Sequence, residues 1–286
     1  MIEINELLMT YGTNEVLNIR SLSLDEGVSY GIVGHNGAGK TTLFKCITNI
    51  IMTYRGSIKI MGENVKERNE ILTNVGLVLD GMSVYTNQTG WFNIQYFAGL
   101  RGDYNEERVR QLAADLDLYG VLDQKVKTYS YGMQKKLILL IALIHTPKIL
   151  ILDEPFRGLD IDTVRWFKDY LKQLTKEGLT LLISSHVIND LEELCDEVYV
   201  VDRGRISEHI DLKTEKARQY RLIDTTNNTR LIEILEENII PFEMKDERIK
   251  LDIDSAKWGT VYQQLQNEGI EINEMSRVKV LEEKLN

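Results

Sequence analysis

A glycine-rich loop between an expected strand and an expected helix constrains the fold of this chain more than any other segment. Residues 34–42 read Gly-His-Asn-Gly-Ala-Gly-Lys-Thr-Thr and fit the pattern G-x-x-x-x-G-K-[ST]. An apolar run over residues 28–33 precedes the loop, and a helical apolar pattern through Leu43, Phe44 and Ile47 follows it. Strand, glycine loop and helix in this order open an α/β nucleotide-binding unit. The alternative is an ordinary glycine turn, but the flanking strand and helix favour a phosphate loop.

Each part of the loop has an expected role at a bound nucleotide. The glycines let consecutive backbone N–H groups point at phosphate oxygens, and the helix start adds its positive dipole end. We expect Lys40 to reach the β- and γ-phosphates and Thr41 to ligate Mg²⁺. His35 fills a variable position of the pattern and is a bystander rather than a catalytic histidine. The expected nucleotide-binding residues of the loop are Gly34, His35, Asn36, Gly37, Ala38, Gly39, Lys40, Thr41 and Thr42.

Two acidic residues follow a second apolar run. Residues 149–152 read as a buried strand, and Asp153-Glu154-Pro155 comes directly after it. Ligands of open α/β sheets gather at the carboxyl ends of the strands. We therefore expect Asp153 to hold the Mg²⁺ shell and Glu154 to orient and polarise a water against the γ-phosphate. The alternative, acids that merely cap a strand in solvent, is disfavoured by the phosphate loop.

Composition excludes several classes of protein. The 286 residues carry 34 Lys and Arg against 44 Asp and Glu, a net charge of −10, which disfavours a general nucleic-acid binder. The two cysteines, Cys46 and Cys195, are too few for a zinc ribbon or a disulfide scaffold. The longest apolar run, residues 137–144, is far shorter than the ~20 residues of a spanning helix. Acids at the N-terminus argue against a secretion signal, so a membrane role would need another protein as anchor.

The order of patterns along the chain predicts an α/β fold with two additions. Strand patterns at residues 56–60, 75–79 and 181–185 alternate with helices, which indicates a mainly parallel core sheet covered on both faces. The stretch from about 89 to 146 reads as all-helical, an inserted subdomain. After about Leu212 no further phosphate loop occurs, and residues 213–286 read as a small α+β appendage. In it, Asn228 and Ser255 are expected to cap helices.

The segment between the loop and the acids resembles a known family. Residues 129–137, Tyr-Ser-Tyr-Gly-Met-Gln-Lys-Lys-Leu, are similar to the YSxGMxxKL variant of the LSGGQ signature of ATP-binding-cassette (ABC) proteins. With that segment in register, Tyr11 resembles the aromatic A-loop that stacks on adenine. Residues 158–160, Gly-Leu-Asp, resemble the D-loop, and Ser185-His186 resembles the H-loop. The resemblance covers roughly residues 1–212.

The resemblance implies a fold, a reaction and partners. It implies a P-loop NTPase with an N-terminal antiparallel β part, binding ATP and Mg²⁺ between two cassettes paired head to tail as a homodimer or heterodimer. It implies Lys40, Glu154 and His186 as catalytic residues and Thr41, Asp80 and Asp153 near the metal. The chain would be an ATPase on the cytoplasmic, inner face of the cell membrane, held by a separate integral-membrane permease, with no nucleic-acid partner. Beyond the loop, the nucleotide-contacting residues it implies are Tyr11, Ser130, Tyr131, Gly132, Met133 and Asp160.

This chain departs from the family pattern at several positions. Asp80 stands where the Q-loop glutamine is expected. Tyr131 and Met133 replace a glycine and a glutamine of the commonest signature, and Phe156 and Arg157 replace small polar residues before the D-loop. We expect altered coupling or turnover rather than lost activity, because Lys40 and the other catalytic residues are intact.

Residues 89–100 indicate a branch of the family. They resemble the T-x-x-E-N-L-x-x-F-A-x-L segment of ABC-2-type export cassettes, which serve separate permeases that export drugs, antimicrobial peptides or lipids. In that branch the permease docks near the segment that corresponds to residues 80–97 of this chain. Within this segment, Trp91 and Phe92 are either interface aromatics or part of the core. The alternative is a cassette ATPase without a permease, translation-associated or regulatory. Such proteins usually carry two cassettes, and this chain has one phosphate loop. Repair ATPases with long heptad insertions and importers with β-barrel-like appendages also fit less well.

Overall fold

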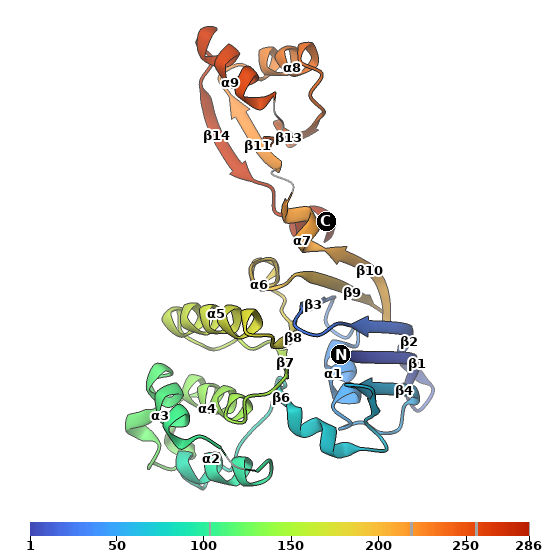
Figure 1. Cartoon of the computed structure of the whole chain (residues 1–286), viewed down its shortest axis with the longest axis vertical. Coiled ribbons are helices and arrows are strands. Elements are labelled where there is room, and N and C mark those ends of the chain that lie inside the picture. Colours follow the sequence, from blue (N-terminus) through green and yellow to red (C-terminus); the bar gives the residue numbers. More distant parts are fainter. Residues whose placement is uncertain (103, 218–219, 255–256, 286) are drawn as a thin grey trace. The chain divides into compact units, whose positions relative to one another are not determined.

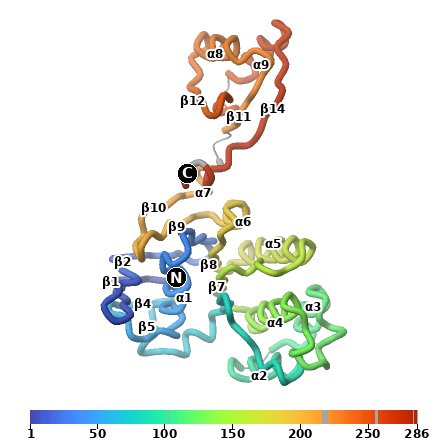
Figure 2. The backbone as a smooth tube through the Cα atoms, turned by 180° about the vertical axis from the view of Figure 1, so that it is seen from behind, coloured from blue at the N-terminus to red at the C-terminus, as the bar shows by residue number. Residues whose placement is uncertain are grey.

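The computed structural model describes residues 1–102, 104–217, 220–254 and 257–285. The chain divides into two compact units, Met1–Ile210 and Asp211–Asn286, each with its own apolar core. Figures 1 and 2 show the first unit from opposite sides, with the helices α2 to α5 gathered on one side and the strands β1, β2 and β4 on the other.

A six-stranded sheet forms the centre of the first unit, in the order β10-β9-β3-β8-β7-β6. The pairs β9–β3, β3–β8, β8–β7 and β7–β6 are parallel, which confirms the predicted α/β class. Every residue of β7 and β8 is buried, as expected where both faces of a parallel sheet are covered. The strands are β3 (Ser29–Val33), β6 (Val75–Val78), β7 (Ile149–Asp153), β8 (Thr180–Ser184), β9 (Glu197–Asp202) and β10 (Arg205–Asp211).

An antiparallel sheet of order β2-β1-β4-β5 covers one side of the helix α1 (Lys40–Ile47). Its first strand alternates buried and exposed residues, the pattern of a sheet with one face on a core. Ile2 and Leu7 of that face share an apolar core with Leu43 of α1 and Ile151 of β7. Helix α1 is thereby fixed between two sheets, as Figure 1 shows. The strands are β1 (Ile2–Tyr11), β2 (Asn14–Leu24), β4 (Arg55–Ile60) and β5 (Glu63–Asn64).

The described residues between 89 and 146, which are expected to be all-helical, form helices and connecting loops, with an isolated antiparallel bridge between Thr89 and Lys125. Helix α4 begins where the Ser130 hydroxyl accepts a hydrogen bond from the Met133 N–H at 3.2 Å, a side-chain cap. Most of α4 is buried, and α3 buries Val109, Leu112 and Ala113 on one face. The helices of this stretch are α2 (Gly90–Gly99), α3 (Glu106–Asp115), η2 (Tyr119–Val121), η3 (Val126–Thr128) and α4 (Tyr131–Leu143). Outside it, η1 (Asn69–Asn74) precedes β6, and α5 (Ile161–Lys176) and α6 (Ile188–Leu194) come after β7.

The second unit has the β-α-β-β-α-β order of a ferredoxin-like fold, with antiparallel strands ordered β12-β13-β11-β14. The predicted cap at Asn228 is wrong by one residue. Asn227 caps α8 through the Arg230 N–H, whereas the Asn228 side chain accepts from the Thr225 N–H. The expected cap Ser255 lies outside the described residues. The elements are α7 (Leu212–Ala217), β11 (Tyr220–Thr225), α8 (Asn228–Glu237), β12 (Phe242–Lys245), β13 (Arg248–Asp252), α9 (Trp258–Asn267), β14 (Ile272–Arg277) and α10 (Val280–Leu285).

Candidate active site

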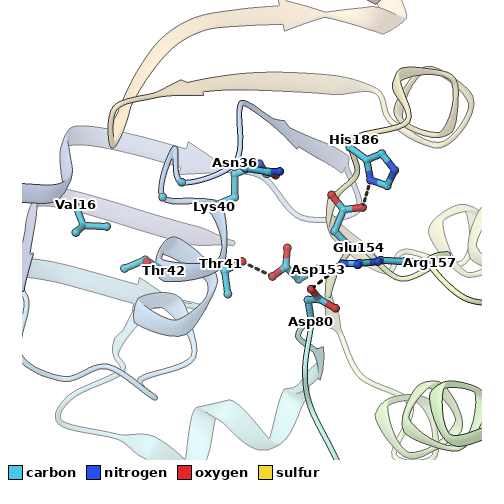
Figure 3. A pocket seen from close by; sticks show the side chains of 12 residues that line it. Val16, Asn36, Lys40, Thr41, Thr42, Asp80, Asp153, Glu154, Arg157 and His186 are labelled. Carbon is cyan, nitrogen blue, oxygen red and sulfur yellow. Dashed lines mark hydrogen bonds and ion pairs between the residues drawn. The ribbon is translucent and has the colours of Figure 1, made fainter. Parts of the chain in front are cut away.

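A polar cavity of about 620 Å³ lies where the carboxyl end of β7 meets the start of α1 (Figure 3). It brings together the glycine loop, the acidic pair and the histidine, although more than a hundred residues separate the loop from the other two in the sequence. Two of its residues, Val16 and Arg157, were not predicted as site residues. The lining residues are Val16, Asn36, Gly37, Gly39, Lys40, Thr41, Thr42, Asp80, Asp153, Glu154, Arg157 and His186.

The glycine loop has a backbone that other residues would not allow. Gly37 and Gly39 have φ values of +83° and +109°, in the left-handed region that favours glycine. A Cβ on Gly34 would lie 2.2 Å from the Val201 carbonyl oxygen, so the loop could not pass β9. The Lys40 ammonium donates to the carbonyls of Gly34 at 2.6 Å and His35 at 3.2 Å. His35 itself does not line the cavity.

Asp153 is a buried carboxylate with two hydroxyl partners. It is 2% exposed, and the Thr41 hydroxyl donates to its Oδ2 at 2.5 Å (Figure 3). The Ser184 hydroxyl donates to its Oδ1. These bonds offset the desolvation of the charge. Thr41 and Asp153 together present hard oxygen donors at the cavity wall, which is the chemistry that Mg²⁺ prefers beside a phosphate.

Glu154 has an unusual backbone conformation and a side chain directed at the histidine. Its φ is +49°, which is rare outside glycine, and its N–H donates to the Ser184 carbonyl at 3.1 Å. Its carboxylate Oε2 lies 2.7 Å from Nδ1 of His186, as Figure 3 shows. The Glu154 side chain is 18% exposed, so it faces the cavity while staying mostly shielded from bulk water. This placement suits a group that orients a water inside the cavity.

An ion pair joins two of the departures from the family pattern. Arg157 Nη1 lies 3.4 Å from Asp80 Oδ2, and both residues line the cavity (Figure 3). Asp80 follows β6, whereas Arg157 lies between β7 and α5. The sequence contains no sign that these two side chains meet.

The remaining predicted residues lie away from the cavity lining. Tyr11, at the end of β1, is 55% exposed. Ser130, Tyr131, Gly132 and Met133 form the start of α4. Residues 11, 130–133 and 160 are all missing from the lining of this single chain.

Asp160 caps the helix α5 and is held by three donors. The Thr163 N–H and hydroxyl donate to its carboxylate at 2.8 and 2.7 Å, and Lys136 of α4 lies 3.0 Å away. These contacts, the N–H bond foremost, hold the pKa of Asp160 well below its usual range. The carboxylate therefore links the first turn of α5 to α4 by a charge that persists in mild acid.

Comparisons with known proteins identify the family. A model of the ABC transporter family matches residues 17–157. The uncharacterized ABC transporter ATP-binding protein YdbJ of Bacillus subtilis (strain 168) is 31% identical over 245 residues, 85% of this chain and 80% of the relative. The chain belongs to the ABC transporter family. As a member of that family, the chain is an ATP-hydrolysing cassette.

Two further similarities extend over nearly the whole chain. The bacitracin transport ATP-binding protein BcrA of Enterococcus faecalis is 31% identical over 285 residues, 96% of this chain and 92% of BcrA. A solved ATP-binding subunit of an ABC transporter has a TM-score of 0.70 at 22% identity, over 93% of this chain and 99% of that one. The second similarity shows the fold. In the described part of this ABC cassette, no helix is both long enough and apolar enough to cross a bilayer.

Proposed function

We propose that this cassette supplies ATP-hydrolysis energy to a separate membrane permease that exports an antimicrobial peptide, a drug or a lipid-like compound. The observation that carries the proposal is the cavity in which Lys40, Thr41, Asp153, Glu154 and His186 meet. The similar protein BcrA is named for the transport of bacitracin, which favours export as the process that this ATPase serves.

Within the cavity we assign the chemical roles as follows. Lys40 and the loop amides bind the phosphates of ATP, and Glu154 orients the attacking water. His186, whose Nδ1 lies 2.7 Å from the Glu154 carboxylate, fixes that side chain and would contact the γ-phosphate of bound ATP. Bound Mg²⁺, held by Thr41 and Asp153 with Asp80 nearby, would neutralise charge on the phosphates.

Each ATP site is completed by a second cassette in this proposal. Ser130 and the backbone of Gly132 lie at the start of α4, a position suited to an anion, yet outside the cavity of their own chain. Residues 130–133 and Asp160 would contact ATP held by the loop of the partner cassette. Tyr11 would stack on adenine. The dimer would close and reopen with each catalytic cycle.

We propose that the permease docks on an aromatic cluster formed by Tyr85, Phe92, Tyr96 and Phe97. The first three side chains are 48, 40 and 41% exposed, and the ring centroids of Tyr85 and Tyr96 are 5.1 Å apart. Trp91 differs, because it is half-buried and lies 5.1 Å from the Arg110 guanidinium. Docking there would keep the cassette on the cytoplasmic face of the membrane.

We assign the second unit an accessory, regulatory role beside the catalytic one. Among the residues that the structure describes, those that line the cavity all belong to the first unit. Its core, formed by residues such as Ile223, Leu231, Ile249 and Val261, is separate from the core around α1. A unit with its own core can act on dimerisation or on the permease without taking part in the chemistry.

The substitution Glu154→Gln tests the proposed reaction. It keeps the shape and hydrogen bonding of the side chain and removes its charge. Turnover should fall by about 100-fold or more, while ATP binding persists and the ATP-bound dimer accumulates. The measurements are steady-state ATPase rates and size-exclusion chromatography with ATP. Near-normal hydrolysis by the variant would refute the role of Glu154.

A further inference from the structure

Helix α4 contains a lysine that is almost fully buried. Lys135 is 5% exposed, although the helix around it is mostly apolar. A lysine is rarely buried without a hydrogen bond or an opposite charge, because its ammonium is costly to remove from water. The role proposed above for the signature segment uses the residues before Lys135 and leaves this lysine unexplained.

The Lys135 ammonium donates to the main-chain carbonyl of Glu154 at 3.3 Å. Glu154 has a left-handed φ of +49°, a conformation that non-glycine residues keep only when their surroundings fix it. One strand and one helix supply the fixing contacts. The N–H of Glu154, which follows β7, donates to Ser184 on β8 at 3.1 Å, and the carbonyl accepts from Lys135 on α4.

Three carboxylates act electrostatically on the same ammonium. Burial lowers the pKa of Lys135, whereas Asp80, Asp153 and Glu154 act in the opposite direction. Arg157 adds to the lowering. The lysine therefore lies close enough to the acidic residues of the cavity for their charges to act on its ammonium.

Two more contacts join the first turns of α4 to the segment after β7. Lys136 lies 3.0 Å from the Asp160 carboxylate, and the ring of Tyr131 lies against Gly158. Of these three residues of α4, Lys135 is the one that contacts Glu154 itself. A movement of α4 would therefore be transmitted to the Glu154 peptide.

We propose that Lys135 is a positioning residue for ATP hydrolysis, which holds the Glu154 main chain so that its carboxylate points into the cavity. This proposal rests on the role of Glu154 proposed above. Because Lys135 and the Ser130 cap belong to one helix, the position of the signature segment and the aim of the carboxylate are coupled within one chain. A cassette whose α4 is displaced would bind ATP with its water-activating group misdirected.

Lys135→Met tests the proposal, because methionine keeps the length and apolar stem of lysine and removes the donor. Misplacing a catalytic group by about 1 Å lowers rates by up to about 100-fold, so kcat should fall about 10- to 100-fold. The dissociation constant of ATP should change less than about threefold, since Lys135 is not part of the phosphate loop. Lys135→Gln, which retains a donor, should recover part of the lost kcat.

The matched control is Lys168→Met on α5. Lys168 has a side chain only 14% exposed and pairs with Asp190 at 2.7 Å, so its removal costs stability without touching Glu154. The kcat of the Lys168→Met variant should remain within about twofold of the native value. Thermal melts of all variants separate lost folding from lost turnover. If Lys135→Met does not fold, the proposal is tested by comparing Lys135→Gln with Lys168→Met. Lys135→Gln should then have the lower kcat, and equal kcat values would overturn the proposal.

A double-mutant cycle with Glu154→Gln identifies the route of the effect. Since Lys135 acts through Glu154, adding Lys135→Met to Glu154→Gln should not lower the single-turnover rate further. An unchanged kcat in Lys135→Met, or an equal loss in both backgrounds, would overturn the proposal. Full activity of Glu154→Gln alone would instead overturn the proposed role of the carboxylate, so the two failures are distinct.

Discussion

The contact between Tyr131 and Gly158 predicts an energetic coupling between the signature segment and the D-loop of one chain. Gly158 has a φ of +82°, and a Cβ placed on it would lie 2.3 Å from Cε1 of the Tyr131 ring. Gly158→Ala therefore introduces two separate costs, a strained backbone and a clash with the ring. Replacing Tyr131 by alanine removes the second cost and leaves the first.

The size of each cost follows from the geometry. An alanine in the left-handed region is less stable than glycine by about 1–2 kcal/mol. To restore ordinary contact at 3.4 Å, the ring must retreat by about 1 Å. The ring can do so because Tyr131 is 61% exposed, at a cost of about 0.5–1.5 kcal/mol for an altered rotamer. Gly158→Ala should thus cost roughly 2–3 kcal/mol with Tyr131 present and about 1–2 kcal/mol without it.

The assay must report on the first unit alone, because the two units need not unfold together. The three tryptophans make this possible, since Trp91 and Trp166 belong to the first unit and Trp258 to the second. In a Trp258→Phe background, tryptophan fluorescence during heating follows the first unit. A coupling of about 1 kcal/mol corresponds to about 2–4 °C in Tm for a unit of this size.

Gly178→Ala provides the control for backbone strain. Gly178 has a φ of +99° and no neighbouring atom within 4 Å of an added Cβ. Its substitution should lower Tm by the same amount with and without Tyr131. The reasoning is refuted if Gly158→Ala and Gly178→Ala have equal effects, or if the effect of Gly158→Ala does not depend on Tyr131.

Two further predictions concern the composite site and the acid stability of the cassette. Ser130→Arg should bind ATP without forming the closed dimer, and Lys40→Ala should fail to bind ATP; mixing them should restore partial ATPase activity if sites can act singly. Wild-type turnover by Ser130→Arg, independent of protein concentration, would contradict the shared site. Burial, with the Arg101 guanidinium 2.8 Å away, lowers the pKa of His145 to about 4, below its unfolded value of about 6.5. The unfolded chain then binds more protons between these values, so stability is lost as the pH falls from about 6.5 towards 4. Urea melts at pH 7.5 and at pH 5 measure how much the free energy of unfolding falls between the two. This fall should be smaller for His145→Gln than for the native chain, by up to about 2 kcal/mol.

The sequence predicts those parts of the fold that depend on local pattern. The apolar run before Asp153 predicts a buried strand, and β7 is buried throughout. The periodicity of Val109, Leu112 and Ala113 predicts the inward face of α3, which the structure confirms. Where two adjacent residues have the same propensity to cap a helix, the sequence does not indicate which of them is the cap. Asn227 and Asn228 are both good caps, and the turn after β11 decides between them by engaging Asn228 with Thr225.

Partners of the site residues that depend on strand register or helix rotation could not be predicted. Ser184 reaches Asp153 because β7 and β8 pair with these two residues directly opposite each other. Nothing in either strand sequence sets that register. Lys135 and Lys136 are adjacent in the sequence, and only the rotation of α4 turns the first toward Glu154 and the second toward Asp160. Val16 reaches the cavity because β2 belongs to the sheet that covers α1.

The departures at positions 80 and 157 are better understood as a pair than as two separate losses. Asp80 adds one negative charge where the family pattern has a neutral glutamine, and Arg157 adds one positive charge where it has a neutral residue. The net charge of the site is therefore unchanged, and the two side chains form an ion pair of 3.4 Å at the cavity wall. Both are exposed, at 39 and 63%, so their attraction is worth at most about 1 kcal/mol. A pair this weak separates readily when phosphates or a metal offer stronger partners. The acidic side chain can thus occupy the glutamine position without closing the cavity, which agrees with an intact set of Lys40, Glu154 and His186.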